Sequence, residues 1–247
     1  MDTPLPDPPG IAAASNDALG SLSQVIYASD SFEEVYEAIV TTAVRLIDGC
    51  DHASIMQRDK NGTFQTVAST DDTSRTIDKL EQLHREGPCL DAIVEDLPQF
   101  ENDLSDPDTQ WPALAEQVVR QTPVRAVAGF RIIAGDQKIG ALNLFSDQPN
   151  GMGKESADQA IVLAAFASVA VSALHGKQEA RTLAAGLESN REIGKAIGLL
   201  MAFHKISDAA AFDLLRKASQ DMNIKLAEVA REVVAHHNTG HPAPRIG

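Results

Sequence analysis

The stretch that decides the architecture is 190–237, NREIGKAIGLLMAFHKISDAAAFDLLRKASQDMNIKLAEVAREVVAHH. Its apolar residues recur every three or four positions in three separate runs, 193–201, 211–218 and 226–234, and this spacing indicates three amphipathic helices. Ser207 and Asp208 supply an N-cap for the second helix, and Asn223 supplies one for the third. Three short helices joined by tight turns bury one small core, to which Met201, Phe212 and Leu215 belong by pattern.

Charge separates this C-terminal region from the rest of the chain; the whole chain has a formal net charge of −14. From Leu187 onward there are eight Lys and Arg against seven Asp and Glu, which leaves 13 basic and 28 acidic residues before it. An acidic body with a near-neutral tail fits a sensor joined to an output module with a polyanionic partner. Charge alone favours the plainer interpretation, in which the lysines of an average tail form a solvated face.

Three motifs give the C-terminal region a specific resemblance. They are A-x-G-x-L-M at 196–201, A-F-x-x-L-R-x-x-S-Q at 211–220 and N-x-K-L-x-E-V-A at 223–230. In order and spacing they resemble an ANTAR domain, a small three-helix output module of bacterial regulators. The resemblance implies a module that binds RNA and prevents transcription termination. Phe203, Ile224 and Ala227 depart from it, since each stands where the family often has a basic residue.

Basic and polar side chains on the predicted helices are the candidate RNA contacts. Taken singly, each is a solvated surface charge; inside an RNA-binding module, they become candidates for phosphate contacts, which supply affinity more than sequence choice. RNA sequence is normally read at unpaired loop bases, and the resemblance implies paired stem-loops of a leader RNA that overlap a terminator. Ser219 and Asn223 can instead serve as local caps. The predicted RNA-binding residues are Arg191, Lys195, Arg216, Lys217, Ser219 and Lys225.

At 247 residues, the chain has room for one sizeable domain beside this module. Aromatic residues make up 4%, which argues against a sheet-type base-stacking surface. The two cysteines, Cys50 and Cys89, have no metal-type spacing and indicate a reducing, cytoplasmic compartment. No signal peptide is evident, and the richest apolar run, 161–174, is shorter than a membrane span. We therefore expect no membrane partner.

Periodicity in the N-terminal part alternates between helical and strand patterns. Ser31 heads a capping-box sequence before a helix that ends at Asp48, and another helix begins near Asn16. Two hairpins are expected, 52–57 with 64–69 and 124–133 with 139–145. Between them lie helices at 74–84 (with Ile77, Leu80 and Leu83 inward), after Gly87, and at 114–120, with a loop-rich stretch before the last. This pattern predicts an α+β domain with an antiparallel sheet flanked by helices.

The sequences EGPCLDA at 86–92, Trp111-Pro112 and GALNLF at 140–145 make this part similar to a GAF sensor domain, over about 31–174. The similarity is to the type that precedes ANTAR modules in actinobacterial regulators. It implies a small-molecule or protein signal, whose binding residues stay unknown because GAF members bind unrelated ligands or none. Some relatives attach bilins to a cysteine, but Cys89 lacks an adjacent histidine signature and is expected to be structural.

A proline-free, alanine-rich stretch, 155–204, predicts one long helix leaving the sensor, on the order of 70 Å long at ~1.5 Å per residue. We expect it to pair with its twin in a homodimer; the alternative is packing onto its own domain without dimerising. The predicted organisation is a disordered Pro-rich N-terminus at 1–14, a GAF-like sensor at 15–175, a final sensor helix and coiled-coil-like linker at 155–190, an ANTAR-like module at 187–240 and a disordered tail at 241–247.

Enzyme signatures are missing from the sequence: there is no Walker loop, dinucleotide fingerprint, nucleophile elbow or zincin helix. We predict no catalytic residues, no metal site and no cofactor, and a non-enzymatic regulator. The competing class is a helix-turn-helix-like DNA-binding or protein-interaction regulator, suggested by the turn between Gln220 and Lys225. A DNA recognition helix usually begins with several basic or amide residues, and here Lys225 stands alone.

Overall fold

The computed structural model describes residues 11–59, 61–95, 97–135 and 137–238, and these divide into two compact units, unit 1 up to His175 and unit 2 from Gly176 on. The predicted disordered ends lie outside the described residues, except 11–14, which are helical. In chain order the elements are α1 Ile11–Ala28, α2 Phe32–Leu46, β1 His52–Arg58, β2 Phe64–Ser69, α3 Asp72–His84, α4 Pro88–Glu95, β3 Gln99–Glu101, α5 Pro112–Gln121, β4 Ala126–Ala134, β5 Gln137–Ser146, α6 Lys154–His204, α7 Asp208–Met222 and α8 Leu226–Asn238.

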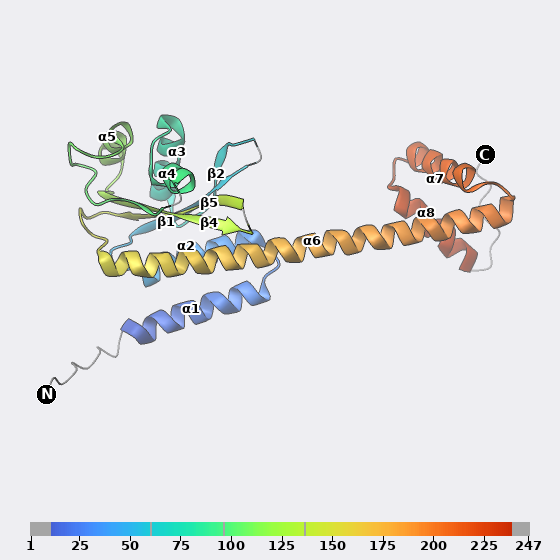
Figure 1. Ribbon diagram of the computed structural model, residues 1–247, viewed down its shortest axis with the longest axis horizontal. Helices are drawn as coiled ribbons and strands as arrows, with labels where there is room; N and C mark the ends of the chain where they lie inside the picture. The colour runs from blue at the N-terminus through green and yellow to red at the C-terminus, as the bar shows by residue number, and fades with distance from the viewer. Residues whose placement is uncertain (1–10, 60, 96, 136, 239–247) are drawn as a thin grey trace. The chain divides into compact units, whose positions relative to one another are not determined.

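Unit 1 is built on one antiparallel sheet with strand order β2-β1-β5-β4-β3. In Figure 1, α2 and α6 cover one face of this sheet, and α3, α4 and α5 cover the other. Because both faces are covered, seven successive residues at the end of β5 are buried. Leu142 and Leu144 belong to the core under α2 and α6, whereas Phe145 belongs to the core under α3 and α5. The predicted hairpins and the α+β architecture are confirmed.

The short strand β3 is the element that sequence reasoning missed, since its three residues fall in a stretch predicted to be loop. It pairs with β4, with Phe100 opposite Ala128. The Phe100 ring also packs edge-on against Phe130, with ring centroids 5.3 Å apart. Three residues are too few to show an alternating pattern, so this strand depends on β4 as a template.

The helix caps follow the predictions only in part. Ser31 is the N-cap of α2, but the Glu34 carboxylate accepts from the Ser29 hydroxyl (2.6 Å) instead of closing a capping box. A complete capping box forms at α3, between Asp71 and Ser74. In the same helix Leu83 is 74% exposed, so its predicted inward position is wrong. The apolar face of α3 ends one turn earlier because its last turn lies beyond the sheet-facing core.

The 51-residue helix α6 contributes to both units. Within unit 1 its buried side packs on the core under the sheet, through Ala160, Leu163, Ala164, Ala167, Ala170, Val171 and Leu174. Its start is held where Gly49 passes Gly151 so closely that a Cβ on Gly49 would lie 2.0 Å from the Gly151 carbonyl oxygen. Among the described residues, α6 is the helix that is long and apolar enough to span a membrane. Core helices meet the same criterion, and 39% of the apolar window is buried in the protein.

Unit 2 closes around one small core formed by the end of α6 with α7 and α8. Its centre comprises Ala196, Leu200, Ala211, Leu215, Ala218, Val229, Ala230 and Val233. Met201 and Phe212, predicted as core, are 37% and 39% exposed, so the predicted stripes are one residue too wide. Asn223 does not cap α8: it ends α7 in the left-handed conformation (φ 54°), and its N–H donates to Gln220 and Ser219. Asparagine tolerates that conformation better than most residues.

A histidine clamp holds three elements of unit 1 together. His52, at the start of β1, contacts Asp71 through Nδ1 (2.5 Å) and Asp147 through Nε2 (3.2 Å). Asp71 caps α3, and Asp147 directly follows β5 on the way to α6. Burial lowers the pKa of His52, but the two carboxylates outweigh burial and raise it above 6.5. Burial raises the pKa of Asp71, and the bonds from His52 and Ser74 bring it below its usual value.

The clamp makes stability depend on pH. Because the folded pKa of His52 is raised, its contribution is fully present below pH 6.5 and is lost as the pH rises through the raised pKa. We expect His52→Gln to lower the free energy of unfolding by about 1 kcal/mol at pH 6, after allowance for the half-exposed carboxylates, and by less at pH 8.5. Urea unfolding at both pH values measures this. A cost that is equal at both pH values would contradict a charged clamp.

Candidate functional site

The C-terminal part of α6 carries two of the predicted RNA contacts, Arg191 and Lys195, one helical turn apart. Ala196 and Leu200 turn inward to the core, which leaves both cations on the outside. Each is paired with a carboxylate three residues before it: Arg191 with Glu188 at 3.8 Å, and Lys195 with Glu192. The two pairs therefore form a mixed-charge row along one side of the helix.

Helix α7 and the following turn carry the other predicted residues. Arg216 pairs with Asp213 at 2.9 Å, and both side chains are more than half exposed. Lys217 and Lys225 are exposed, Lys225 directly before the start of α8. The Ser219 hydroxyl donates to the Ile224 carbonyl (2.6 Å), so its proton closes the turn between α7 and α8. The Ser219 hydroxyl can therefore only accept a hydrogen bond from a ligand. Phosphate oxygens have no proton to donate to it.

The chemistry of this cationic surface follows from these pairs. The Arg191 and Arg216 pairs are exposed, and such pairs contribute only about 0–1 kcal/mol each, so an incoming phosphate can replace the carboxylate at little cost. The Glu192 side chain beside Lys195 is 12% exposed, so replacing that carboxylate costs more. The structure brings Arg191 next to Lys195 on α6 and Arg216 next to Ser219 on α7, in each case at a spacing of one turn. Packing of both helices on the shared core holds these side chains on rigid elements.

Unit 1 contains a buried polar cluster between the sheet and α3 that sequence reasoning missed. The Asp78 carboxylate is fully buried and accepts from Ser54 (2.7 Å), Thr66 (2.7 Å) and the Asn143 amide (3.3 Å). Burial raises the pKa of Asp78 to about 6, although these donors oppose the rise. Asp78 thus ties α3 to three neighbouring strands, β2, β1 and β5.

One turn further along α3, Glu81 is also fully buried. Its Oε2 accepts from the Cys89 backbone N–H (3.3 Å), whereas Oε1 has no hydrogen-bond partner among the described residues. Burial, with the nearby Asp78 carboxylate, raises the pKa of Glu81 well above its usual value, which favours the neutral acid. The same surroundings raise the pKa of the buried Cys89 thiol. Such a thiol is a poor nucleophile, which agrees with the structural role expected for Cys89.

A signal for this cluster is present in the sequence. Asn143 interrupts the apolar run GALNLF, and a polar residue inside a strand covered on both faces needs a buried partner. On α3, Asp78 and Glu81 each follow an inward apolar residue, Ile77 and Leu80. The sequence analysis placed Ile77, Leu80 and Leu83 of this helix inward and made no assignment for the two carboxylates, and charged residues are seldom fully buried.

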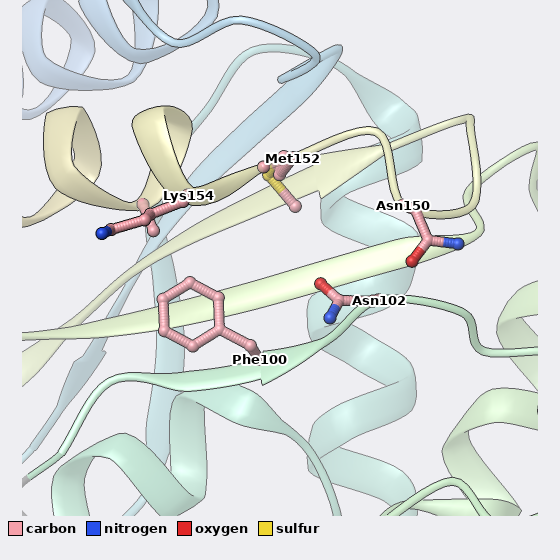
Figure 2. Close-up of a pocket in the computed structure, with 7 residues that line it drawn as sticks. Phe100, Asn102, Asn150, Met152 and Lys154 are labelled. Atoms are coloured by element: carbon pink, nitrogen blue, oxygen red, sulfur yellow. The ribbon is translucent and has the colours of Figure 1, made fainter.

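A second feature of unit 1 is an open hollow of about 400 Å³ at the start of α6 (Figure 2). Phe100 and Met152 supply apolar surface, and Asn102 and Asn150 supply carboxamides. Figure 2 shows the Lys154 side chain extending away from both amides. The hollow can therefore form hydrogen bonds to a neutral polar group that lies against its apolar surface. Its lining does not place several charged groups around one point. The sequence had left the sensor's binding residues unassigned.

Comparisons with known proteins agree with this two-unit description. A GAF domain model matches residues 29–172, which is more than half of the chain, and an ANTAR domain model matches residues 181–234. GAF domains are sensor domains, and ANTAR domains are RNA-binding output domains of antitermination regulators. No curated protein matches the chain significantly.

Solved structures share the fold. A GAF domain of a phosphoenolpyruvate-protein phosphotransferase from Coxiella burnetii is 16% identical with a TM-score of 0.51, over 68% of this chain and 98% of that one. A domain described as part of a two-component sensor histidine kinase from Sinorhizobium meliloti 1021 is 21% identical (TM-score 0.50, 62% and 99%). The photosensory core module of a Stigmatella aurantiaca phytochrome is 14% identical (TM-score 0.51, 85% and 45%). At these identities they establish the fold alone. The chain belongs to the GAF domain family, and its C-terminal unit contains an ANTAR domain.

Proposed function

We propose that this protein is a cytoplasmic transcription antitermination regulator, in which the GAF unit controls an ANTAR unit that binds stem-loops of leader RNAs. The observation that carries the proposal is the ANTAR match over the compact three-helix unit. Apolar side chains form the core of this unit, and its basic side chains lie at the surface. The order of the two domains is the one that the resemblance to actinobacterial regulators implies.

Charge supports binding at unit 2. The residues before Leu187 carry 28 acidic against 13 basic side chains, and this excess repels a polyanion. On unit 2 the paired cations Arg191, Lys195 and Arg216 can exchange their carboxylates for phosphates. RNA would therefore contact the terminal unit and avoid the sensor. A leader hairpin would offer both the stem phosphates and the unpaired loop bases that RNA-binding proteins read.

Dimerisation through α6 is supported by an exposed apolar row with coiled-coil spacing. Intervals of four and three residues alternate along it, which places its members on one side of the helix. Val169, Leu183 and Leu187 are each more than 60% exposed. We call this row the heptad stripe: Val162, Phe166, Val169, Ala173, Gly176, Ala180, Leu183 and Leu187. A second copy of the chain would bury the stripe and supply two ANTAR units per dimer.

Control by the sensor would act on α6. The histidine clamp at Asp147 and the close approach of Gly49 and Gly151 fix the segment that leads into this helix. A small molecule or a partner protein that binds one arrangement of unit 1 more tightly would shift the dimer toward it. The free-energy difference between the arrangements then sets how strongly the RNA-binding units respond.

DNA binding fits less well. In a helix-turn-helix, the helix after the turn contributes its first residues to base contacts. Helix α8 begins with Leu226, Ala227 and Glu228, of which two are apolar and one is acidic. Lys225 is the single cation at that end, and it precedes the helix.

The RNA surface is tested with Lys195→Ala/Arg216→Ala. We expect hairpin affinity to fall at least about tenfold, and the slope of log affinity against log salt to shrink by about 2, because two phosphate contacts are lost. Filter binding over a salt series measures both quantities. The exposed Arg216–Asp213 pair contributes little to folding, and the loss of Lys195 leaves the largely buried Glu192 unpaired, so the unfolding midpoint should fall only slightly.

The matched control is Arg45→Ala/Lys79→Ala, which removes one Arg and one Lys from exposed positions of unit 1. It should leave hairpin affinity unchanged. If both double variants bind RNA like the wild type, or weaken it equally, the assigned surface is wrong.

The heptad stripe is tested with Val169→Glu/Leu183→Glu. Each dimer would then place like charges opposite each other in an apolar seam, so we expect monomers. Sedimentation equilibrium measures the mass. Gln178→Glu, an exposed position on the opposite side of the helix, is the control and should leave a dimer. A dimeric Val169→Glu/Leu183→Glu protein would rule out this seam.

A further inference from the structure

Phe203 and His237 form an exposed ring pair on unit 2. The two rings meet edge to face, with centroids 5.3 Å apart and planes inclined at 66°. Phe203 lies in the last turn of α6 and His237 in the last turn of α8. Single exposed apolar residues are common on protein surfaces, so exposure alone decides nothing. Here, however, a second helix places another aromatic ring in contact with Phe203, so this position is not a single exposed apolar residue.

The pair is anchored but lies outside the core. Phe203 is 55% exposed and is not part of the cluster that closes unit 2. Three residues before it, Leu200 is buried; three residues after it, Ile206 packs on the core. Lys205 takes the left-handed conformation (φ 53°), which fixes where the chain turns away from the ring. The backbone on both sides therefore fixes the position of the Phe203 ring, although the ring is not part of the hydrophobic core.

Phe203 lies on an oblique row of α6 that also carries two of the predicted phosphate contacts. Arg191, Lys195 and Phe203 fall on one row of i, i+4 neighbours of α6, with Leu199 between the last two. Phe203 is about 12 Å beyond Lys195 along the axis, at ~1.5 Å per residue. Lys205, two residues later in the chain, is an exposed cation. A strand whose phosphates contact Arg191 and Lys195 would reach the rings within a few nucleotides.

We propose that Phe203 and His237 form a stacking platform for one unpaired nucleobase in the loop of a bound RNA hairpin. An edge-to-face pair uses one face of one ring, so other ring faces stay open for a third ring. Phenylalanine and histidine are among the side chains on which unpaired RNA bases stack. A protein partner fits less well, because stable interfaces need about 800 Å² per side and this site is one ring pair. The inference rests on the proposed RNA-binding function and adds a contact to the bases.

The test uses the full-length chain and a hairpin selected with it from a pool of RNAs that share one stem and differ in the loop. Phe203→Leu keeps an apolar side chain and removes the ring. We expect it to weaken hairpin binding roughly 5- to 100-fold, as loss of one stacked base does, and to leave binding to the blunt duplex of the same stem unchanged. Phe203→Trp should retain hairpin binding. In the wild type, ultraviolet crosslinking should map a loop nucleotide to the peptide that contains Phe203.

Phe212→Leu is the matched control, since Phe212 is the other phenylalanine of unit 2 and is partly exposed. It should leave both affinities unchanged, and the thermal midpoints of all variants should stay close to wild type. Hairpin binding by Phe203→Leu equal to that of the wild type would overturn the platform and leave RNA binding intact. A wild-type chain that retains no hairpin from the pool would overturn both.

Discussion

The packing of α6 against the sheet of unit 1 is the constraint on which the rest depends. Four alanines on its buried side, Ala160, Ala164, Ala167 and Ala170, let the helix approach the core closely, and Leu163 fills the space between them. Because that side is committed to the sensor, the heptad stripe is left on another side. The same helix then supplies Ala196 and Leu200 to the core of unit 2. One continuous element is thus part of the sensor, of the proposed dimer seam and of the RNA-binding unit.

The two units differ in where they place their charged side chains. In unit 1, Asp78 and Glu81 are fully buried, which costs desolvation free energy. His52 is held between two carboxylates. Asp78 ties α3 to the sheet, Glu81 ties α3 to α4, and His52 joins the sheet to α3 and to Asp147 on the way to α6. On unit 2 the Arg191 and Arg216 pairs lie at the surface and exchange readily, whereas the Glu192 carboxylate beside Lys195 is largely buried. The acidic sensor and the near-neutral terminal unit therefore suit different partners.

Sequence patterns predicted the elements with strong periodicity or strong turn signals. The α2 and α3 helices, both hairpins, the long α6 and the three-helix unit all follow from spacing and caps. The predictions that were wrong concern features that tertiary contacts determine. The strand β3 exists because β4 is there to pair with it, and Glu34 reaches Ser29 instead of closing a box. Leu83, Met201 and Phe212 sit at the edges of otherwise correct apolar faces, where a residue's burial depends on how far the neighbouring element extends.

For the candidate site, the sequence predicted which cations lie outside, but not their carboxylate partners or the engagement of the Ser219 hydroxyl. It also could not place Phe203 against His237, because that contact joins the ends of two helices far apart in the chain. The most direct test of the account is sequencing of RNAs crosslinked to the protein in its own cells. The account predicts reads concentrated at stem-loops that overlap terminators in leader transcripts. Reads that follow transcript abundance, without enrichment at such stem-loops, would contradict it.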